Sequence, residues 1–408
     1  MKHLFLILLA GYLIPGILVA QESEQKLKVS INGYIANEMY FDTYNSATSR
    51  DGQIYFYPLP EDLDANGDDL NKNFQAQMLA IQSRTRLTLS GLEAFGAKAT
   101  GAIEGDFLGT TQDYTRHFRL RHAFIKLNWQ NAELLTGQFW HPMFVTGCFP
   151  GVFSFGAGAP FNPLNRAPQV RYTYQPNQNI SLMGAALFHG DFRSSGPLGA
   201  QQNSGLPDMQ FQMIYKNDFV FTGFTAGYKF LTPRTETEMG VKTSETIGSY
   251  NLQAFAKFIT RPVTIKLQGA YGQNMTNYVM IGGYGAAEDP LLPGNDDYSY
   301  INKNTVSLWA ELLTNFEAFN AAIFAGYSSN LGASDNYFSL DYARGENIDY
   351  IFRISPRVQY SSGPVTLILE HMMTGAAYAT NFDENYKPTE SDSPTINHRV
   401  IFAAKYSF

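Results

Sequence analysis

Arginines placed two positions apart are the residues of this sequence best suited to binding chemistry. Arg84 and Arg86 form one such pair, and Arg119 and Arg121 form another. A guanidinium is always charged and binds a carboxylate or a phosphate in a forked arrangement. In an extended strand, residues two apart point to the same side. The spacing therefore predicts rows of anion-binding groups on one face of a sheet.

The segments around these arginines alternate polar and apolar residues. From Leu27 to Phe41 nearly every second residue is apolar, and the same period returns at 263–271 and 348–360. Strands of soluble sheets average about five or six residues, whereas a strand that crosses a membrane needs roughly nine to eleven. The phase slips between His122 and Ile125, which predicts a β-bulge. Sixteen alternating segments start near residues 27, 76, 97, 116, 132, 166, 179, 208, 219, 247, 263, 303, 318, 348, 365 and 395.

The connections between these segments alternate between short turns and long loops, which is typical of an outer-membrane barrel. We therefore predict an all-β fold: a transmembrane antiparallel β-barrel of about sixteen strands with short periplasmic turns and long extracellular loops. The barrel must close, because an unpaired backbone group in hydrocarbon costs several kcal/mol. A barrel of sixteen strands is wide enough to leave an aqueous channel.

The first twenty residues predict a secretory signal peptide. Lys2 precedes an apolar stretch, and Ala20 is followed by polar residues. An N-terminal membrane anchor is the alternative, and Pro15 and Gly16 disfavour it. We expect the signal peptide to span 1–20 and a single barrel domain to span 21–408, exported to the outer membrane of a Gram-negative cell.

Composition excludes several other classes of protein. The 408 residues have a net charge of -7, with 14% aromatic and 16% charged residues, so there is no basic footprint for nucleic acid. The single cysteine cannot form an internal disulfide or a thiolate metal site. The seven histidines are scattered, and no serine lies in a nucleophile elbow. We expect neither catalysis nor a cofactor, and we assign no residue as a metal ligand.

If the apolar parity faces outward, a set of charged residues lines the lumen. The free-energy cost of placing ten cationic side chains in lipid would be prohibitive, which supports this assignment. Their functional interpretation is an electropositive wall that favours anions. The alternative is that they pair with inward carboxylates, including Glu38, Glu311, Asp349 and Glu370, and brace the wall; both can hold. The predicted pore-lining residues are Arg84, Arg86, Arg119, Arg121, Arg171, Lys266, Arg353, Arg357, Arg399, Lys405, Glu104 and Asp106.

The third long loop, 141–165, is rich in Gly, Pro and Phe and carries almost no charge. A loop facing water is rarely so apolar, so we predict that it folds inward and narrows the channel. A subunit interface or a lid is the alternative. The predicted constriction residues are Phe144, Cys148, Phe149, Phe153, Phe155 and Phe161.

Two further features lie near the ends of the pattern. The last segment alternates up to Phe408, and a terminal aromatic on the apolar face resembles the signal read by the barrel-insertion machinery of Gram-negative outer membranes. Near the start, the acidic run from Asp62 to Asp69 has Gly67 in its sixth position and resembles the first half of a calcium loop. Asn73 stands where the bidentate Glu is needed, so calcium binding and a solvated acidic loop both remain open.

Three stretches, 119–127, 134–140 and 167–172, resemble the corresponding region of sixteen-stranded Gram-negative porins, particularly the DcaP-like branch. The resemblance implies a trimeric diffusion porin whose third loop forms the constriction and whose wall arginines attract small anions. The predicted function is passive diffusion of small polar or anionic solutes through a barrel that contacts outer-membrane lipid. One alternative is a scaffold that holds a surface partner with the loops 43–74, 274–302, 328–347 and 375–394. The other is a lipid transporter, which would need an apolar lumen.

Overall fold

The computed structural model describes residues 26–289, 296–335, 337–339 and 342–408. The predicted signal peptide, 1–20, lies outside these residues. Twenty strands form one antiparallel sheet that closes on itself. Four of them are accessory: β4 (Gln75–Leu79), β15 (Gly282–Ala286), β18 (Tyr342–Arg344) and β21 (Pro388–Ser391). The remaining sixteen make up the wall, as predicted.

The wall strands start within three residues of the predicted positions, apart from the second. There β4 precedes a break at 80–83, and β5 continues beside β1. The wall strands are β1 (Lys28–Asp42), β5 (Arg84–Ala94), β6 (Ala97–Asp106), β7 (Arg119–Asn128), β8 (Ala132–Trp140), β9 (Arg166–Tyr174), β10 (Ile180–Leu187), β11 (Asp208–Lys216), β12 (Val220–Leu231), β13 (Ile247–Ile259), β14 (Val263–Gln273), β16 (Tyr300–Thr314), β17 (Phe319–Ala333), β19 (Ile348–Ser362), β20 (Val365–Phe382) and β22 (Thr395–Ser407).

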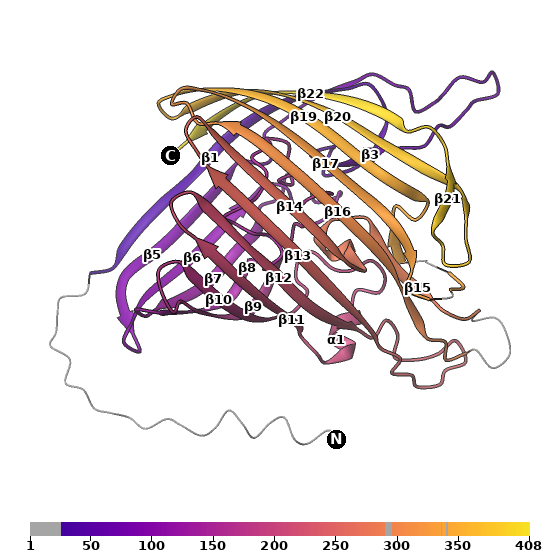
Figure 1. Cartoon of the computed structure of the whole chain (residues 1–408), viewed down its shortest axis with the longest axis horizontal. Coiled ribbons are helices and arrows are strands. Elements are labelled where there is room, and N and C mark those ends of the chain that lie inside the picture. The colour runs from indigo at the N-terminus through magenta and orange to yellow at the C-terminus, as the bar shows by residue number, and fades with distance from the viewer. Residues whose placement is uncertain (1–25, 290–295, 336, 340–341) are drawn as a thin grey trace.

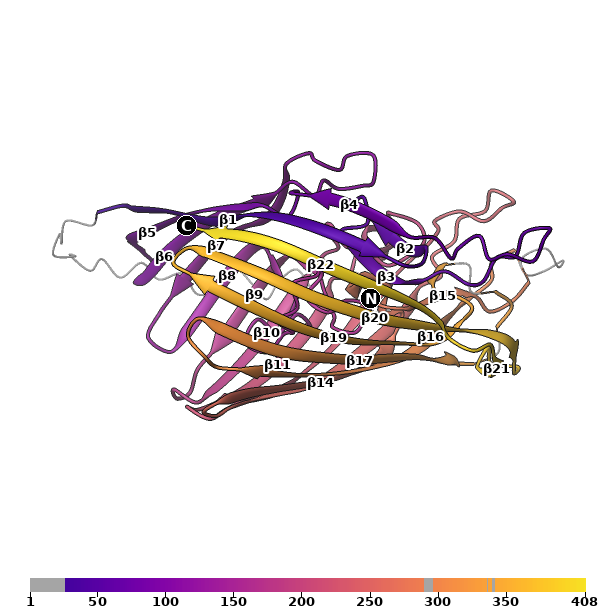
Figure 2. The same ribbon diagram turned by 90° about the horizontal axis from the view of Figure 1, so that it is seen from above.

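The barrel is closed by pairing between its first and last strands. β1 and β22 are antiparallel over a register that runs from Tyr34 opposite Ser407 to Asp42 opposite Arg399 (Figure 2). At the end of this seam, Gly33 and Phe408 exchange two backbone hydrogen bonds of 3.0 and 3.1 Å. No wall strand is therefore left with an open edge.

The short turns gather at the end of the barrel that carries the C-terminus, and the long loops gather at the opposite end (Figure 1). Two short helices lie in the loops: α1 (Ala200–Ser204) and the 3-10 helix η1 (Met275–Tyr278). No helix in the described part of the chain is long and apolar enough to cross a membrane.

The two faces of the wall follow the predicted parity. On the outside, Ile31 is 63% exposed and Phe402 is 51% exposed. On the inside, Glu38 is fully buried and Arg399 is 2% exposed. Exposed apolar side chains thus cover the outer surface, while most of the charged side chains of the strands point inward.

The predicted β-bulge exists, but it lies one residue before the predicted interval. Glu104 pairs with His122 and Gly105 pairs with Leu120, so Arg121 is the extra residue of β7. The bulge lets Arg121 and His122, although adjacent in sequence, both be buried. The apparent phase slip further along the sequence is the downstream effect of this insertion.

Candidate functional site

The third loop, 141–165, runs across the inside of the barrel and is hydrogen-bonded to the wall. The N–H of Gly151 donates to both carboxylate oxygens of Glu311, at 2.9 and 3.0 Å. The N–H of Phe153 donates to Glu370 at 2.5 Å. These bonds hold the middle of the loop against β16 and β20, so the loop narrows the lumen.

Apolar side chains fix the two flanks of the same loop. Phe161 is fully buried and packs with Trp309 and Phe324 on the inner wall. Cys148 is also fully buried, and its Sγ lies 3.5 Å from the carbonyl oxygen of Ala256. Two of the predicted constriction residues, Cys148 and Phe161, therefore attach the loop to the inner wall.

A second loop element enters the barrel, and it was not predicted. The hairpin formed by β2 (Ser46–Ser49) and β3 (Ile54–Pro58) lies against inward residues of the wall. The amide of Gln53 donates to Glu38 at 2.6 Å, and Arg353 donates to the carbonyl oxygen of Phe56 at 3.0 Å. Part of the first long loop therefore lies within the lumen, where it cannot contact a surface partner.

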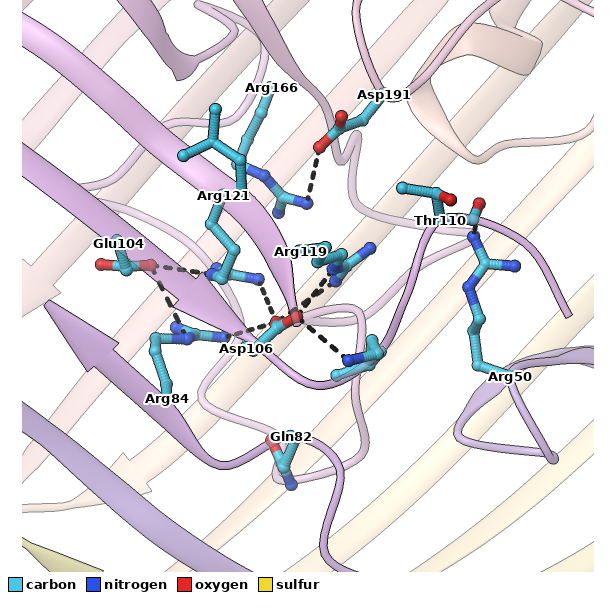
Figure 3. Close-up of polar contacts among 12 residues, drawn as sticks. Arg50, Gln82, Arg84, Glu104, Asp106, Thr110, Arg119, Arg121, Arg166 and Asp191 are labelled. Atoms are coloured by element: carbon cyan, nitrogen blue, oxygen red, sulfur yellow. Dashed lines mark hydrogen bonds and ion pairs between the residues drawn. The ribbon is translucent and has the colours of Figure 1, made fainter. Parts of the chain in front are cut away.

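Four arginines on β5 and β7 lie close to two carboxylates of β6. Figure 3 shows three of them, Arg84, Arg119 and Arg121, around Glu104 and Asp106. Asp106 accepts hydrogen bonds from Arg119 at 2.7 Å and Arg121 at 3.0 Å. Glu104 accepts from Arg121 at 2.7 Å and lies 3.6 Å from Arg84 and 3.7 Å from Arg86. With four cations and two anions, this arginine cluster keeps an excess of two positive charges.

Arg166 extends the arginine cluster along the wall and was not predicted. Its guanidinium is 3.6 Å from Asp191 (Figure 3). The guanidinium also lies over the rings of Trp140 and Phe192, 5.2 and 5.1 Å from their centroids. In the alternation of β9, Arg166 shares the parity of the outward Val170, which is why the pattern did not assign it to the lumen. It is nevertheless fully buried, and it contacts Asp191 and Phe192 of the loop 188–207.

A cavity of about 390 Å³ separates the arginine cluster from the third loop. Arg84, Arg121 and Arg166 line one side of it, and no acidic residue is among the described residues that line it. Aromatic side chains of the loop line the other side; the predicted constriction residues among them are Phe144, Phe149, Phe153 and Phe155. This cavity is the candidate functional site.

The other predicted lumen residues do not line this cavity and are mostly paired. Lys266 and Arg357 both contact Glu311, at 2.7 and 3.4 Å. Arg399 lies 2.8 Å from Asp42. The bracing considered from the sequence is therefore present, and it coexists with the excess charge of the arginine cluster.

Three further predicted residues make contacts of other kinds. Arg171 donates to the side-chain oxygen of Gln169 at 2.9 Å, and Arg353 donates to Ala159 of the third loop at 2.9 Å. The Nζ of Lys405 lies over the ring of Tyr34, 5.5 Å from its centroid. These cations fix the wall and its loops rather than line the cavity.

The acidic run 62–69 forms a tight turn at the loop end. Backbone N–H groups of Asp68 and Asn66 donate to the carboxylate of Asp64 and hold its pKa below the usual value. Tyr44 donates to Asp69 at 2.5 Å, which lowers the pKa of that carboxyl as well. Within the described residues, no group of three or more His, Cys, Asp or Glu side chains is arranged to hold a metal ion.

A closed barrel of sixteen antiparallel strands is the fold of the outer-membrane porins. The structure is similar to DcaP, an outer-membrane channel of Acinetobacter baumannii, with a TM-score of 0.69 and 16% identity over 96% of this chain and 100% of that chain. The predicted resemblance to sixteen-stranded porins and to their DcaP-like branch is thereby confirmed for the fold.

Two other solved structures share this architecture. OmpT of Vibrio cholerae matches with a TM-score of 0.56 and 10% identity over 95% of this chain and 99% of its own. An anion-selective porin from Comamonas acidovorans matches with a TM-score of 0.56 and 12% identity over 94% of this chain and all of its own. No protein-family model and no curated protein sequence matches the chain.

Proposed function

We propose that this protein is an outer-membrane channel for the passive diffusion of small hydrophilic solutes, with a preference for anions. The observation that carries the proposal is the cavity between the third loop and the wall, whose lining includes three arginines. A solute crossing this constriction sheds part of its hydration, so fixed charge there selects by sign. The porin fold supports this function, and the anion-selective relative supports the sign. No cofactor or covalent step is needed.

We further propose the cellular setting that such a channel requires. Residues 1–20 direct export, the barrel-insertion machinery reads Phe408, and residues 21–408 form the barrel in the lipid of the outer membrane. A trimeric assembly is the third element of this proposal. One structure of OmpT from Vibrio cholerae is described as a trimer form. Conductance that closes in three equal steps would support the assembly, and single steps would contradict it.

The anion preference predicts the sign of a reversal potential. In a planar bilayer with KCl at ten times higher concentration on one side, zero current is expected at the potential that balances chloride rather than potassium. Replacing Arg84 and Arg86 with Gln removes the excess of two charges in the arginine cluster and should shift this potential toward zero. Replacing the outward Thr85 with Ser on the same strand is the matched control. Potassium selectivity of the native channel would contradict the proposal.

The inward hairpin predicts a change in conductance. Asn45 and Leu59 are joined by a backbone hydrogen bond of 3.0 Å, so a short Gly-Ser linker can replace residues 46–58. Because the hairpin occupies the lumen, the deletion is expected to raise the single-channel conductance in 1 M KCl about twofold or more. Deleting residues 63–69, which form the exposed turn of the same loop, should leave it unchanged. Equal conductance in the native and hairpin-deleted channels would show that the hairpin does not obstruct the ion path.

A further inference from the structure

The charge of the protein is divided between the wall and the long loops. The eight long loops between the wall strands contain 22 Asp and Glu but only 8 Lys and Arg, a net charge of -14. The sixteen wall strands contain 18 Lys and Arg but only 10 Asp and Glu, a net charge of +8. The overall net charge of -7 conceals this separation.

The negative charge belongs to the parts of the loops that lie outside the barrel. The two inward elements, 46–58 and 141–165, contribute only Arg50 and Asp51. The remaining loops form an acidic rim around the opening at the loop end, and several of their carboxylates are exposed. The exposed acids of this rim include Glu61, Asp62, Asp68, Glu236, Glu238, Glu384, Glu390 and Asp392.

We propose that the acidic rim and the basic lumen act in series and make the channel rectify ionic current. The proposal rests on the channel function proposed above and adds a direction to it. Fixed charge raises the local concentration of mobile ions of the opposite sign. The rim therefore concentrates cations, and the lumen concentrates anions.

The order of the acidic rim and the basic lumen along the channel determines the sign of the voltage at which the current is larger. When the loop side is positive, cations enter through the acidic rim and anions enter through the basic lumen from the turn side, so each ion enters the zone that favours it. Both zones then fill with mobile ions, and the conductance is high. When the loop side is negative, each ion must enter through the zone that repels it, and the junction between the zones is depleted. Current is therefore larger with the loop side positive.

The test uses the full chain in planar bilayers with equal KCl on both sides. Met239 is 80% exposed at the loop end and Cys148 is buried, so Met239→Cys can be biotinylated, and streptavidin added to one chamber reports which way the channel faces. At 0.1 M KCl, where the Debye length is about 10 Å, we expect the current ratio between equal opposite voltages to be about 1.5 to 3. At 1 M KCl, where it is about 3 Å, the ratio should approach 1.

Charge variants give the matched comparison. Neutralising Glu236, Glu238, Glu384 and Glu390 with Gln removes four charges from the rim and should lower the ratio. Neutralising Asp218 and Glu317, which lie in turns at the opposite end, should not lower it. A linear current at 0.1 M KCl, or a larger current with the loop side negative, would overturn the inference while leaving the channel function intact. Absence of any conductance would contradict the channel function itself, and the inference with it.

Discussion

Replacing Asp106 with Asn is expected to lower the free energy of unfolding by about 3 to 5 kcal/mol, because it removes the charge that balances a buried group of arginines. Asp106 is fully buried and bonds Arg119 and Arg121, which are 6% and 1% exposed. Asn keeps the size and one acceptor oxygen but not the charge. Glu104 would then face four cations alone. Urea unfolding in lipid vesicles, followed by tryptophan fluorescence, measures the change.

The matched control for this prediction is Glu133→Gln. Glu133 lies 3.0 Å from Lys126, and both side chains are 26% exposed. Water solvates both groups after the substitution, so a loss below about 1 kcal/mol is expected. If Asp106→Asn were as mild as this control, water or counterions would have to reach the arginine cluster freely, and the cluster would not be a buried network.

Replacing Leu267 with Lys should lower the stability in lipid vesicles by about 2 to 4 kcal/mol, because it places a cation near the middle of the hydrocarbon layer. Leu267 is on the outward face of β14, 42% exposed, and lies opposite Ala256 and Ala310. The next residue toward the turn, Lys266, faces inward and pairs with Glu311. A lysine is thus tolerated at position 266, which faces inward, but is expected to lower the stability at position 267, which faces the lipid.

Gln359→Lys supplies the inward counterpart. Gln359 shares the inward parity of Arg353 and Arg357 on β19, in the half of the strand nearer the turn. A lysine there meets water, so its effect on the free energy of unfolding should remain below about 1 kcal/mol. Equal losses for the two lysine variants would contradict the assignment of the two faces to lipid and water.

The fold could be predicted because a barrel wall imposes one simple rule on its sequence. Each strand meets different surroundings on its two faces, so polarity repeats every two residues, as it does from Leu27 to Phe41. The rule fails where the backbone departs from regular pairing. The extra residue Arg121 shifts the phase of β7 without changing its composition, so the slip was predicted but its location was not. The break at 80–83 was not predicted.

The candidate site was predicted only in part, because loops carry no comparable rule. The low charge of 141–165 showed that this loop avoids water, and the structure places it in the lumen. The hairpin 46–58 also lies in the lumen. It was not predicted, because it contains the charged residues Arg50 and Asp51 and belongs to a loop that is otherwise acidic. Arg166 was missed because its burial depends on the fold of the separate loop 188–207, through Asp191 and Phe192.

The seam between β1 and β22 has a consequence for the order of assembly. Tyr34 and Ser407, which face each other across it, are separated by 373 residues, whereas the other neighbouring wall strands are joined by a turn or a single loop. Bringing such distant segments together costs more chain entropy than any hairpin, and contacts of long sequence separation form slowly. We therefore expect the backbone groups on one edge of β1 to remain unpaired during folding until the other wall strands have formed. A peptide with the sequence of β22 should compete for that edge only during folding, and not once the ring is complete.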